Sequence, residues 1–237
     1  MTRSAALLVA ILRVGLALDG NTTQAPVTRT DLDARVSRFL EQRRGTWRDM
    51  NVPDADGRQL HEIVLKNGYK QALEIGTSTG HSGVWIAWAL AKTGGRLITI
   101  DIDEGRHREA VRNFKEVGLD AVIDARLADA HDLVPQLAGP FDFVFIDADK
   151  DWYTNYATAV IPKLRVGGCL TAHNVYPGRR LRGMTGDFYG YITSLPFLDT
   201  TVNTAGGGLS ISYKRREPQE ASAPSSRRRS NPSRAWR

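Results

Sequence analysis

Short apolar runs alternate with helical patterns between about residues 29 and 213, and this alternation restricts the fold more than any other feature of the sequence. The runs have the length of strands, and in the segments between them apolar residues recur at three- and four-residue steps. Strands that alternate with helices form right-handed β-α-β units, in which a parallel sheet is covered on both faces. The sequence therefore predicts an α/β fold with a Rossmann-like, doubly wound, mostly parallel seven-stranded sheet.

The last two predicted strands are separated by a glycine-rich stretch at 205–208. A short Gly-bearing segment between two apolar runs is typical of a β-hairpin, so the last strand is expected to enter the sheet antiparallel. Strands are predicted over residues 71–75, 97–100, 122–127, 141–146, 169–172, 198–202 and 209–213. Helices are predicted over residues 31–44, 54–67, 81–91, 104–117, 131–137, 153–164 and 188–195, the first two each with an opening Asp that is able to cap.

The two ends of the chain differ from this domain, which is predicted to span 29–213. Residues 214–237 hold eight basic and two acidic residues and account for the whole formal net charge of +6. They are rich in Pro and Ser and have no apolar period, so a disordered basic tail is predicted. The neutral body argues against a specific nucleic-acid partner, although such a tail is also able to touch RNA, DNA or an anionic surface.

Residues 1–28 are predicted to be an N-terminal arm or a signal-like segment. The first 18 residues have a basic start and an apolar core, but Arg13 interrupts that core. The run is shorter than the ~20 apolar residues of a transmembrane span, so none is expected. The alternative is a helix that covers the body or a second subunit. The single cysteine, Cys169, excludes an intramolecular disulfide.

A glycine-bearing turn follows the first predicted strand, in LEIGTSTGHSG. Gly76 and Gly80 permit a tight turn into the next helix, whose free N–H groups face a ligand. The second strand ends in Asp101, which is placed to accept both hydroxyls of a ribose. The spacing is not G-x-G-x-x-G, because Ser78 stands where the second Gly would be. Alternatively, Glu74 caps the turn and Asp101 and Asp103 cap the next helix.

Polar side chains also follow the fourth and fifth predicted strands. Asp147 ends the fourth, His173 and Asn174 end the fifth, and Lys150 lies one turn beyond Asp147. Adjacent parallel strands bring these side chains to one edge of the sheet. The sequence therefore predicts a three-ligand site for a divalent cation, with Asp147, His173 and Asn174 as ligands.

These motifs together resemble a known family. LEIGTSTGHSG, ITIDID, ADAHDLVPQL, FDFVFIDADKDWY and HNVYPG, in this order and spacing, are similar to the class I S-adenosylmethionine-dependent O-methyltransferases. The likeness is to the cation-dependent small-molecule branch, which includes the catechol and caffeoyl-CoA O-methyltransferases. It runs from about residue 46 to 213, and the segment Asp49-Met50-Asn51-Val52 resembles the one that closes over cofactor and substrate in the catechol enzymes.

The resemblance implies roles for individual residues. Glu74, Gly76 and Ser82 would hold the methionine part of S-adenosylmethionine, Asp101 its ribose, and Ala130 and His131 its adenine. The full set of expected cofactor-binding residues is Val52, Glu74, Gly76, Thr77, Ser78, Gly80, Ser82, Asp101, Ile102, Asp129, Ala130, His131 and Asp147. Asp147 would touch both cofactor and metal, and Lys150 would be the catalytic base.

His173 departs from the family pattern, which normally has Asp at this position. Replacing a carboxylate by imidazole removes a charge and introduces a nitrogen donor, whereas magnesium prefers oxygen ligands. Weaker magnesium binding, a shift toward manganese, iron, cobalt or zinc, or no metal at all is therefore expected. His173 is interpreted as a metal ligand, with a role as a base near neutral pH as the alternative.

The expected acceptor is the hydroxyl of a small aromatic, phenolic or catechol-like molecule. The substrate residues are predicted to be Met50, Lys150, Asn174 and Tyr176, with Trp152 and Pro177 as further candidates for an apolar slot. No Glu occurs between Arg180 and Tyr213, so recognition of a vicinal diol through such a carboxylate is not expected.

Two functions other than O-methyl transfer remain open from the sequence. A nicotinamide (NAD)-dependent oxidoreductase would also need the Gly-rich turn and Asp101, and a nucleic-acid-directed methyltransferase would use the basic tail. S-adenosylmethionine is made inside cells, so a cytoplasmic location is favoured over export or membrane association through the N-terminal segment. The family resemblance also implies a homodimer.

Overall fold

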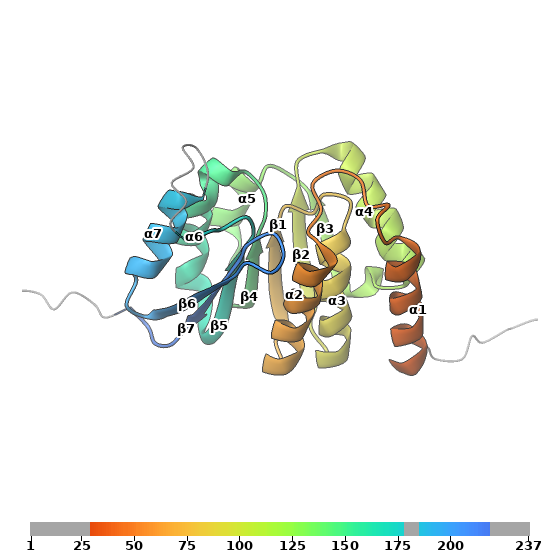
Figure 1. Cartoon of the computed structure of the whole chain (residues 1–237), viewed down its shortest axis with the longest axis horizontal. Helices are drawn as coiled ribbons and strands as arrows, with labels where there is room; N and C mark the ends of the chain where they lie inside the picture. The colour runs from red at the N-terminus through yellow and green to blue at the C-terminus, as the bar shows by residue number, and fades with distance from the viewer. Residues whose placement is uncertain (1–28, 178–184, 219–237) are drawn as a thin grey trace, which may run out of the picture.

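A computed structural model describes residues 29–177 and 185–218, and they contain the seven-stranded sheet that the sequence predicts (Figure 1). The strand order is β3-β2-β1-β4-β5-β7-β6. The strands are β1 (Gln71–Ile75), β2 (Arg96–Asp101), β3 (Ile123–Leu127), β4 (Phe141–Ile146), β5 (Leu164–Ala172), β6 (Leu198–Asn203) and β7 (Leu209–Lys214). The order reverses between β1 and β4, which is where sheets of this type bind ligands.

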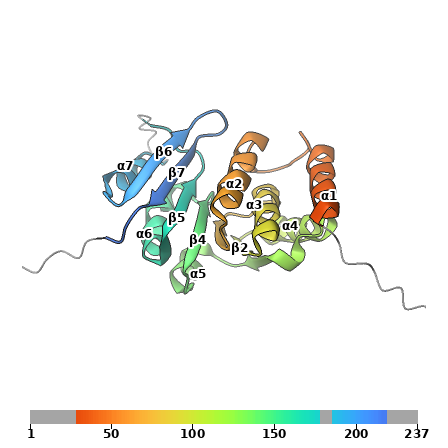
Figure 2. The ribbon, with the colours of Figure 1, turned by 90° about the horizontal axis from the view of Figure 1, so that it is seen from below.

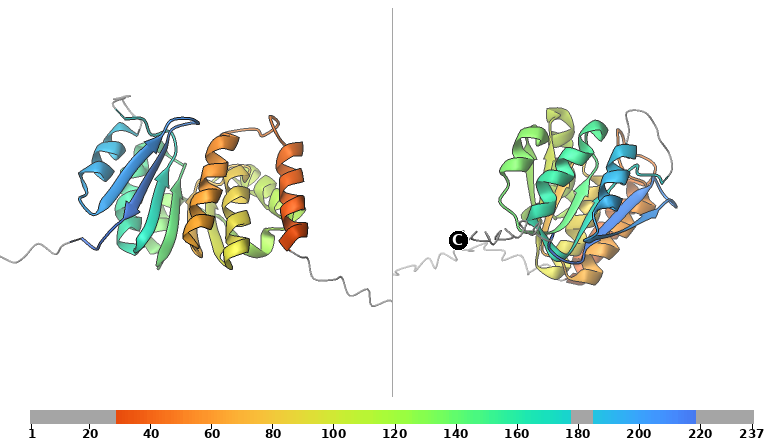
Figure 3. Two further views of the ribbon diagram at one scale, coloured as in Figure 1. Left: turned by 60° about the horizontal axis from the view of Figure 1, so that its bottom comes forward. Right: turned by 90° about the vertical axis from the view of Figure 1, so that its left-hand side faces the viewer.

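The sheet is parallel except at β7, which runs antiparallel to both of its neighbours, β5 and β6. The predicted fold class and the antiparallel last strand are therefore confirmed. The β6–β7 hairpin lies at the end of the sheet far from α1 (Arg29–Gln42) (Figure 3). Its turn contains the predicted glycine-rich stretch at 205–208.

Helices cover both faces of the sheet (Figure 2). One layer consists of α1, α2 (Asp54–Asn67), α3 (His81–Thr93) and α4 (Glu104–Val117), and the other of α5 (Ala130–Gln136), α6 (Tyr153–Val160) and α7 (Gly186–Ser194). Because side chains alternate along a strand, Phe143 and Phe145 of β4 pack into the first layer and Val144 and Ile146 into the second. Every residue of β4 is buried, as expected for a central parallel strand.

Two predicted boundaries and one predicted cap are corrected. The predicted helix at 153–164 ends at Val160 and continues as a short 3₁₀ turn, Ile161–Lys163, because Pro162 lacks the N–H that an α-helix needs. The fifth strand begins at Leu164, five residues before the predicted start. Asp54 is the first helical residue of α2 and does not cap it; the cap position is occupied by Pro53.

The predicted tail also begins one residue too early. Lys214 belongs to β7 and is completely buried, and its Nζ donates to the carbonyl of Leu164 at 2.8 Å and pairs with Glu217 at 2.7 Å. Lysine is rarely buried, and these partners satisfy its charge here. The remaining predictions for 1–28 and for 219–237 lie outside the described residues.

None of the helices in the described ranges is both long enough and apolar enough to cross a membrane.

Candidate active site

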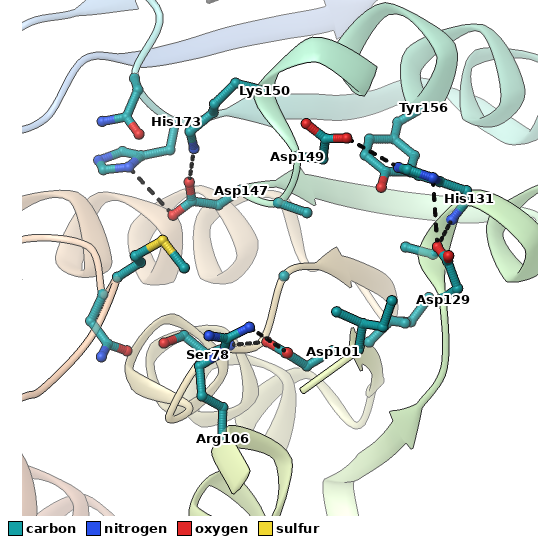
Figure 4. Close-up of a pocket in the computed structure, with 18 residues that line it drawn as sticks. Ser78, Asp101, Arg106, Asp129, His131, Asp147, Asp149, Lys150, Tyr156 and His173 are labelled. Carbon is teal, nitrogen blue, oxygen red and sulfur yellow. Dashed lines mark hydrogen bonds and ion pairs between the residues drawn. The ribbon is translucent and has the colours of Figure 1, made fainter. Parts of the chain in front are cut away.

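A cavity of about 680 Å³ opens at the carboxyl ends of the parallel strands (Figure 4). It is bordered by residues that follow β1, β2, β4 and β5, which bracket the point where the strand order reverses. The predicted site residues that line it are Met50, Gly76, Ser78, Asp101, Ile102, Asp129, Ala130, His131, Asp147, Lys150, His173 and Asn174. Residues distant in sequence are thus brought together where the sequence analysis expects a ligand.

The turn after β1 forms one wall. Gly76 has a φ of 102°, and a Cβ on it would lie 2.3 Å from the carbonyl oxygen of Asp147. Only glycine fits there, because the conformation is left-handed and the end of β4 leaves no space. A hydrogen bond connects this turn to the end of β2: the N–H of Ser78 donates to Oδ2 of Asp101 at 2.7 Å.

Asp101 ends β2 and is held by further donors. Its Oδ1 accepts from the N–H of Asp103 at 2.9 Å and lies 3.4 Å from the guanidinium of Arg106. Asp103 caps α4 by accepting from the N–H of Arg106 at 2.8 Å, so the capping interpretation holds for Asp103. Asp101 instead presents a fixed carboxylate to the cavity, which is the geometry required to bind ribose hydroxyls.

Glu74 lies completely buried beneath the turn and does not line the cavity. Its Oε2 accepts from the Thr99 hydroxyl at 2.5 Å, whereas its Oε1 has no hydrogen-bond partner among the described residues. Desolvation raises the pKa of Glu74 to about 7, against the opposing effect of the Ser82 and Thr99 hydroxyls. A buried carboxylate oxygen without a partner is suited to a donor group on a bound ligand.

His131 lies at the end of the cavity away from Lys150 and His173 (Figure 4). Its ring stacks on Trp152 with centroids 4.2 Å apart, and its Nε2 is 3.3 Å from a carboxylate oxygen of Asp149. Asp129 positions the residue by accepting from its backbone N–H at 2.8 Å. A further aromatic ring, that of Tyr156, lines the same end. The partly exposed His131 ring is suited to contact the face of a purine base, whereas Tyr156 is buried.

Asp147 and Lys150 form an ion pair in the part of the cavity next to the end of β5. The Nζ of Lys150 donates to Oδ1 of Asp147 and, at 2.7 Å, to the hydroxyl of Tyr153. Burial raises the pKa of Tyr153 well above its ordinary value, so this phenol remains neutral. The alternative pairing of Lys150 with Asp149 or Asp151 is not seen.

His173 lies between two carboxylates. Its Nε2 is 2.9 Å from Oδ2 of Asp56, and its Nδ1 is 3.4 Å from Oδ2 of Asp147. Desolvation by itself would lower the pKa of His173, but the hydrogen bonds to Asp147 and Asp56 outweigh it and raise the pKa to about 9. The ring is therefore a cation at neutral pH.

The three predicted metal ligands lie together, and two of them, Asp147 and His173, pair with other charged groups. Both nitrogens of His173 face carboxylates, and the two oxygens of Asp147 face Lys150 and His173. Asn174 donates from Nδ2 to the carbonyl of Gly207 at 3.3 Å. In the part of the chain that the structure describes, no group of three His, Cys, Asp or Glu side chains is arranged to hold a metal ion.

Several predicted cofactor residues lie outside the cavity lining. Val52 is buried and its carbonyl accepts from Nδ1 of His81 at 2.9 Å, while the Thr77 hydroxyl is 2.5 Å from that of Thr99. Gly80 starts α3, where a Cβ would lie 2.7 Å from the Phe114 ring. Ser82 and Tyr176 are also absent from the lining, and Tyr176 packs on Gly208. These residues support the walls of the cavity.

Sequence reasoning assigned no role to several contributors, among them Asp56, Arg106, Asp149 and Tyr156. Arg106 lies in the first turn of the helix after Asp101, Asp149 lies within the DADK motif, and Tyr156 follows that motif. Their closeness in sequence to predicted site residues could have indicated all three. Asp56 lies on α2, 117 residues before His173. No local pattern connects those two.

A glycine turn and a fixed carboxylate at the switch point of a doubly wound sheet define a nucleotide-binding α/β protein. The O-methyltransferase family model matches residues 31–179, and the chain belongs to this family. This confirms the family resemblance, and it favours methyl transfer over the nicotinamide and nucleic-acid alternatives.

The chain is similar to individual members of the family. It is 43% identical over 130 residues to a catechol O-methyltransferase from Niastella koreensis, covering 53% of this chain and 58% of that one. It is 30% identical over 134 residues to a caffeoyl-CoA O-methyltransferase from Medicago sativa, covering 54% of each. The matches thus span little more than half the length of these curated relatives.

Solved structures agree with the fold. An O-methyltransferase from Bacillus cereus in complex with SAH superposes with a TM-score of 0.65 at 25% identity, over 77% of this chain and 91% of that one. The O-methyltransferase TomG from Streptomyces achromogenes, in complex with SAM, superposes with a TM-score of 0.65 at 25% identity, over 76% of this chain and 89% of that one.

Proposed function

We propose that this protein transfers the methyl group of S-adenosylmethionine to a hydroxyl of a small aromatic acceptor. The observation that carries the proposal is the joining of two half-sites in one cavity. One half, with Gly76, Asp101 and His131, is suited to a nucleoside, and the other contains the Asp147–Lys150 pair. A transferase needs its donor and its acceptor side by side in this way.

Residues of the first half fit the cofactor. The carboxylate of Asp101 would accept from the ribose hydroxyls, and the His131 ring would lie against the adenine. Glu74 lies beneath the turn and does not line the cavity, so its predicted contact with the methionine part stays a prediction. The glycine turn at Gly76 allows the backbone to approach the ligand closely. S-adenosylmethionine supplies an electrophilic methyl group on a sulfonium centre.

Lys150 is assigned the proton transfer. A phenol has a pKa of ~10 and is a poor nucleophile while protonated. In its neutral amine form, Lys150 accepts the hydroxyl proton on Nζ as the acceptor oxygen bonds to the methyl carbon and the carbon–sulfur bond breaks. The ammonium that results pairs with Asp147. Asp147 and Tyr153 hold that nitrogen at the edge of the cavity. This step uses no metal ion, in keeping with the contacts of His173.

The acceptor is proposed to be phenolic for two reasons. The lining includes Met50, an exposed residue that offers an apolar contact for a ring, and Asn174, which offers an amide. The names of the two relatives, catechol O-methyltransferase and caffeoyl-CoA O-methyltransferase, refer to phenolic acceptors. The predicted contact of Tyr176 with the substrate, the homodimer and the cytoplasmic location stay predictions.

A methyl-transfer assay tests the proposal. The full chain is incubated with S-adenosylmethionine and a panel of phenols, catechols and aliphatic alcohols, and both S-adenosylhomocysteine and methylated product are measured. We expect stoichiometric formation of the two products with at least one phenol and none with the alcohols. Absence of cofactor binding in calorimetry, or binding without transfer to any phenol, would contradict the proposal.

A further inference from the structure

The most unusual group in the cavity is the His173 ring, which bridges carboxylates from two distant elements. Asp56 comes from α2 and Asp147 from the end of β4, and the two ring nitrogens face them at 2.9 Å and 3.4 Å. Asp56 is 1% exposed and His173 is 5% exposed. An ionised carboxylate only accepts hydrogen bonds, so a ring that lies between two carboxylates is suited to hold a proton on each nitrogen, and with both protons it carries a positive charge.

The β6–β7 turn fixes this arrangement from the other side. The N–H of Gly207 donates to Oδ2 of Asp56 at 2.6 Å, the same oxygen that accepts from His173. A Cβ on Gly207 would lie 2.3 Å from Nε2 of His173, and one on Gly206 would lie 2.1 Å from Oδ1 of Asp56. The glycines therefore let the turn close directly over the pair, and the ring has no space to rotate away on that side.

A divalent cation at this position would compete with two nitrogen donors for the oxygens of Asp147. Each oxygen of Asp147 faces a nitrogen donor, one on Lys150 and one on His173. The ring presents an N–H to Asp147 where a metal ligand would present a lone pair. His173 itself lines the cavity, next to Lys150 and Asn174, so its charge lies close to the acceptor half of the site.

We propose that the His173 ring, held by Asp56, takes the place of a divalent cation beside Asp147, so that this protein transfers methyl groups without a metal ion. Asp56 is then a positioning residue, which acts through His173 and does not touch the substrate. A fixed positive charge near the acceptor oxygen stabilises the negative charge that develops there as its proton leaves. The catalytic role of His173 in this inference rests on the proposed function. The part that concerns metal binding, namely that no divalent cation binds beside Asp147, does not depend on it.

The metal-binding part is tested without any acceptor. Mn²⁺ and Mg²⁺ are titrated into the full chain saturated with S-adenosylhomocysteine, and binding is followed by calorimetry and by the electron paramagnetic resonance signal of free Mn²⁺. We expect no saturable site in the wild type and a new site in His173→Asp, which supplies a carboxylate beside Asp147 and Asn174. A wild-type site that His173→Ala removes would overturn the proposal, and so would the absence of a site in both proteins.

The catalytic part is tested by chelation and by Asp56→Asn. We expect the wild-type kcat to be the same with excess chelator and with added Mg²⁺. Asp56→Asn is expected to lower kcat by roughly 10- to 100-fold, as loss of an outer supporting partner does elsewhere, with the Kd for S-adenosylmethionine unchanged. Asp54→Asn on the same helix is the control, because Asp54 contacts His81 and Arg44 and not His173.

The outcomes separate the two proposals. Loss of wild-type activity on chelation, restored by Mg²⁺, would overturn the metal-free mechanism and leave the methyltransferase function intact. Failure of every phenol, together with a new Mn²⁺ site in His173→Asp only, would refute the proposed function and retain the substitution of His173 for a cation. Circular dichroism checks that each variant is folded. If His173→Asp does not fold, the kcat of Asp56→Asn still tests the role of the His173 ring.

Discussion

The Nζ atom of Lys150 lies 2.7 Å from the phenol oxygen of Tyr153, and the Tyr153 side chain is completely buried. The Tyr153 ring packs edge-on against Phe188 of α7, with centroids 5.4 Å apart, which fixes the position of its hydroxyl. Lys150 thus contacts the neutral hydroxyl of Tyr153 as well as Asp147, and it lines the cavity. Tyr153 is a positioning residue for the proposed base.

Replacement of Tyr153 by Phe is expected to lower kcat by about tenfold, because one hydrogen bond to a charged group is lost. The Kd for S-adenosylmethionine should not change, since Tyr153 does not line the cavity. Steady-state kinetics and calorimetry measure the two quantities. Tyr191→Phe, which loses only an exposed contact with Thr158, serves as the control. Equal kcat in Tyr153→Phe and the control would show that Tyr153 does not position the base.

Lys150→Met is expected to lower kcat by roughly 100- to 10,000-fold, the range for loss of a general base. Met retains much of the side-chain volume and removes the nitrogen that accepts the proton. Cofactor affinity should stay within the error of calorimetry. The matched control is Lys92→Met, whose Nζ pairs with Asp33 at 2.8 Å away from the cavity. If turnover of Lys150→Met matched that of the control, Lys150 would have no part in the reaction.

Asp101→Asn is expected to weaken binding of S-adenosylmethionine by roughly 10- to 100-fold, because hydrogen bonds to a charged acceptor contribute about 1.5–3 kcal/mol. The Asn side chain would also place an amide N–H opposite the backbone N–H of Ser78 or of Asp103, where the Asp101 carboxylate accepts a hydrogen bond. Calorimetric titration of the cofactor measures the loss. Asp103→Asn is the control, because Asp103 caps α4 and does not line the cavity. Similar affinities in the two variants would exclude Asp101 from the cofactor site.

The stability of the protein is expected to fall as the pH rises from about 7 to about 9. The pKa of His173 is raised to about 9 by Asp56 and Asp147, from 6.5 in an unfolded chain. A raised pKa stabilises the folded state below the unfolded value, and this contribution is lost as the pH passes the folded value. The difference in pKa corresponds to about 3 kcal/mol at most.

Urea unfolding of the wild type and of His173→Gln across this pH range measures the effect. The free energy of unfolding should decline further in the wild type than in the variant. Glu74, whose pKa is raised to about 7, is common to both proteins, so its contribution cancels in the comparison. Parallel curves would show that His173 is not a cation in the folded state.

Local patterns in the sequence predicted the frame of the site. The helices at 54–67 and 104–117 and the strands at 71–75 and 141–146 have the predicted bounds. Apolar periodicity and turn residues determine such elements, because they depend on neighbours a few residues apart. The alternation of strands and helices then places Gly76, Asp101, Asp147 and His173 at one edge of the sheet, since parallel strands share an orientation.

The partners of these residues were decided by tertiary structure. Lys150 pairs with Asp147, although Asp149 and Asp151 are closer in sequence, because Asp147 and Tyr153 face the same side of the chain after β4. Asp56 meets His173 across 117 residues, through the packing of α2 and the close approach of the β6–β7 turn. The sequence by itself determined which side chains stand at the edge of the sheet. Only the packing of distant elements decided that the imidazole there pairs with two carboxylates, because no local period encodes such a contact.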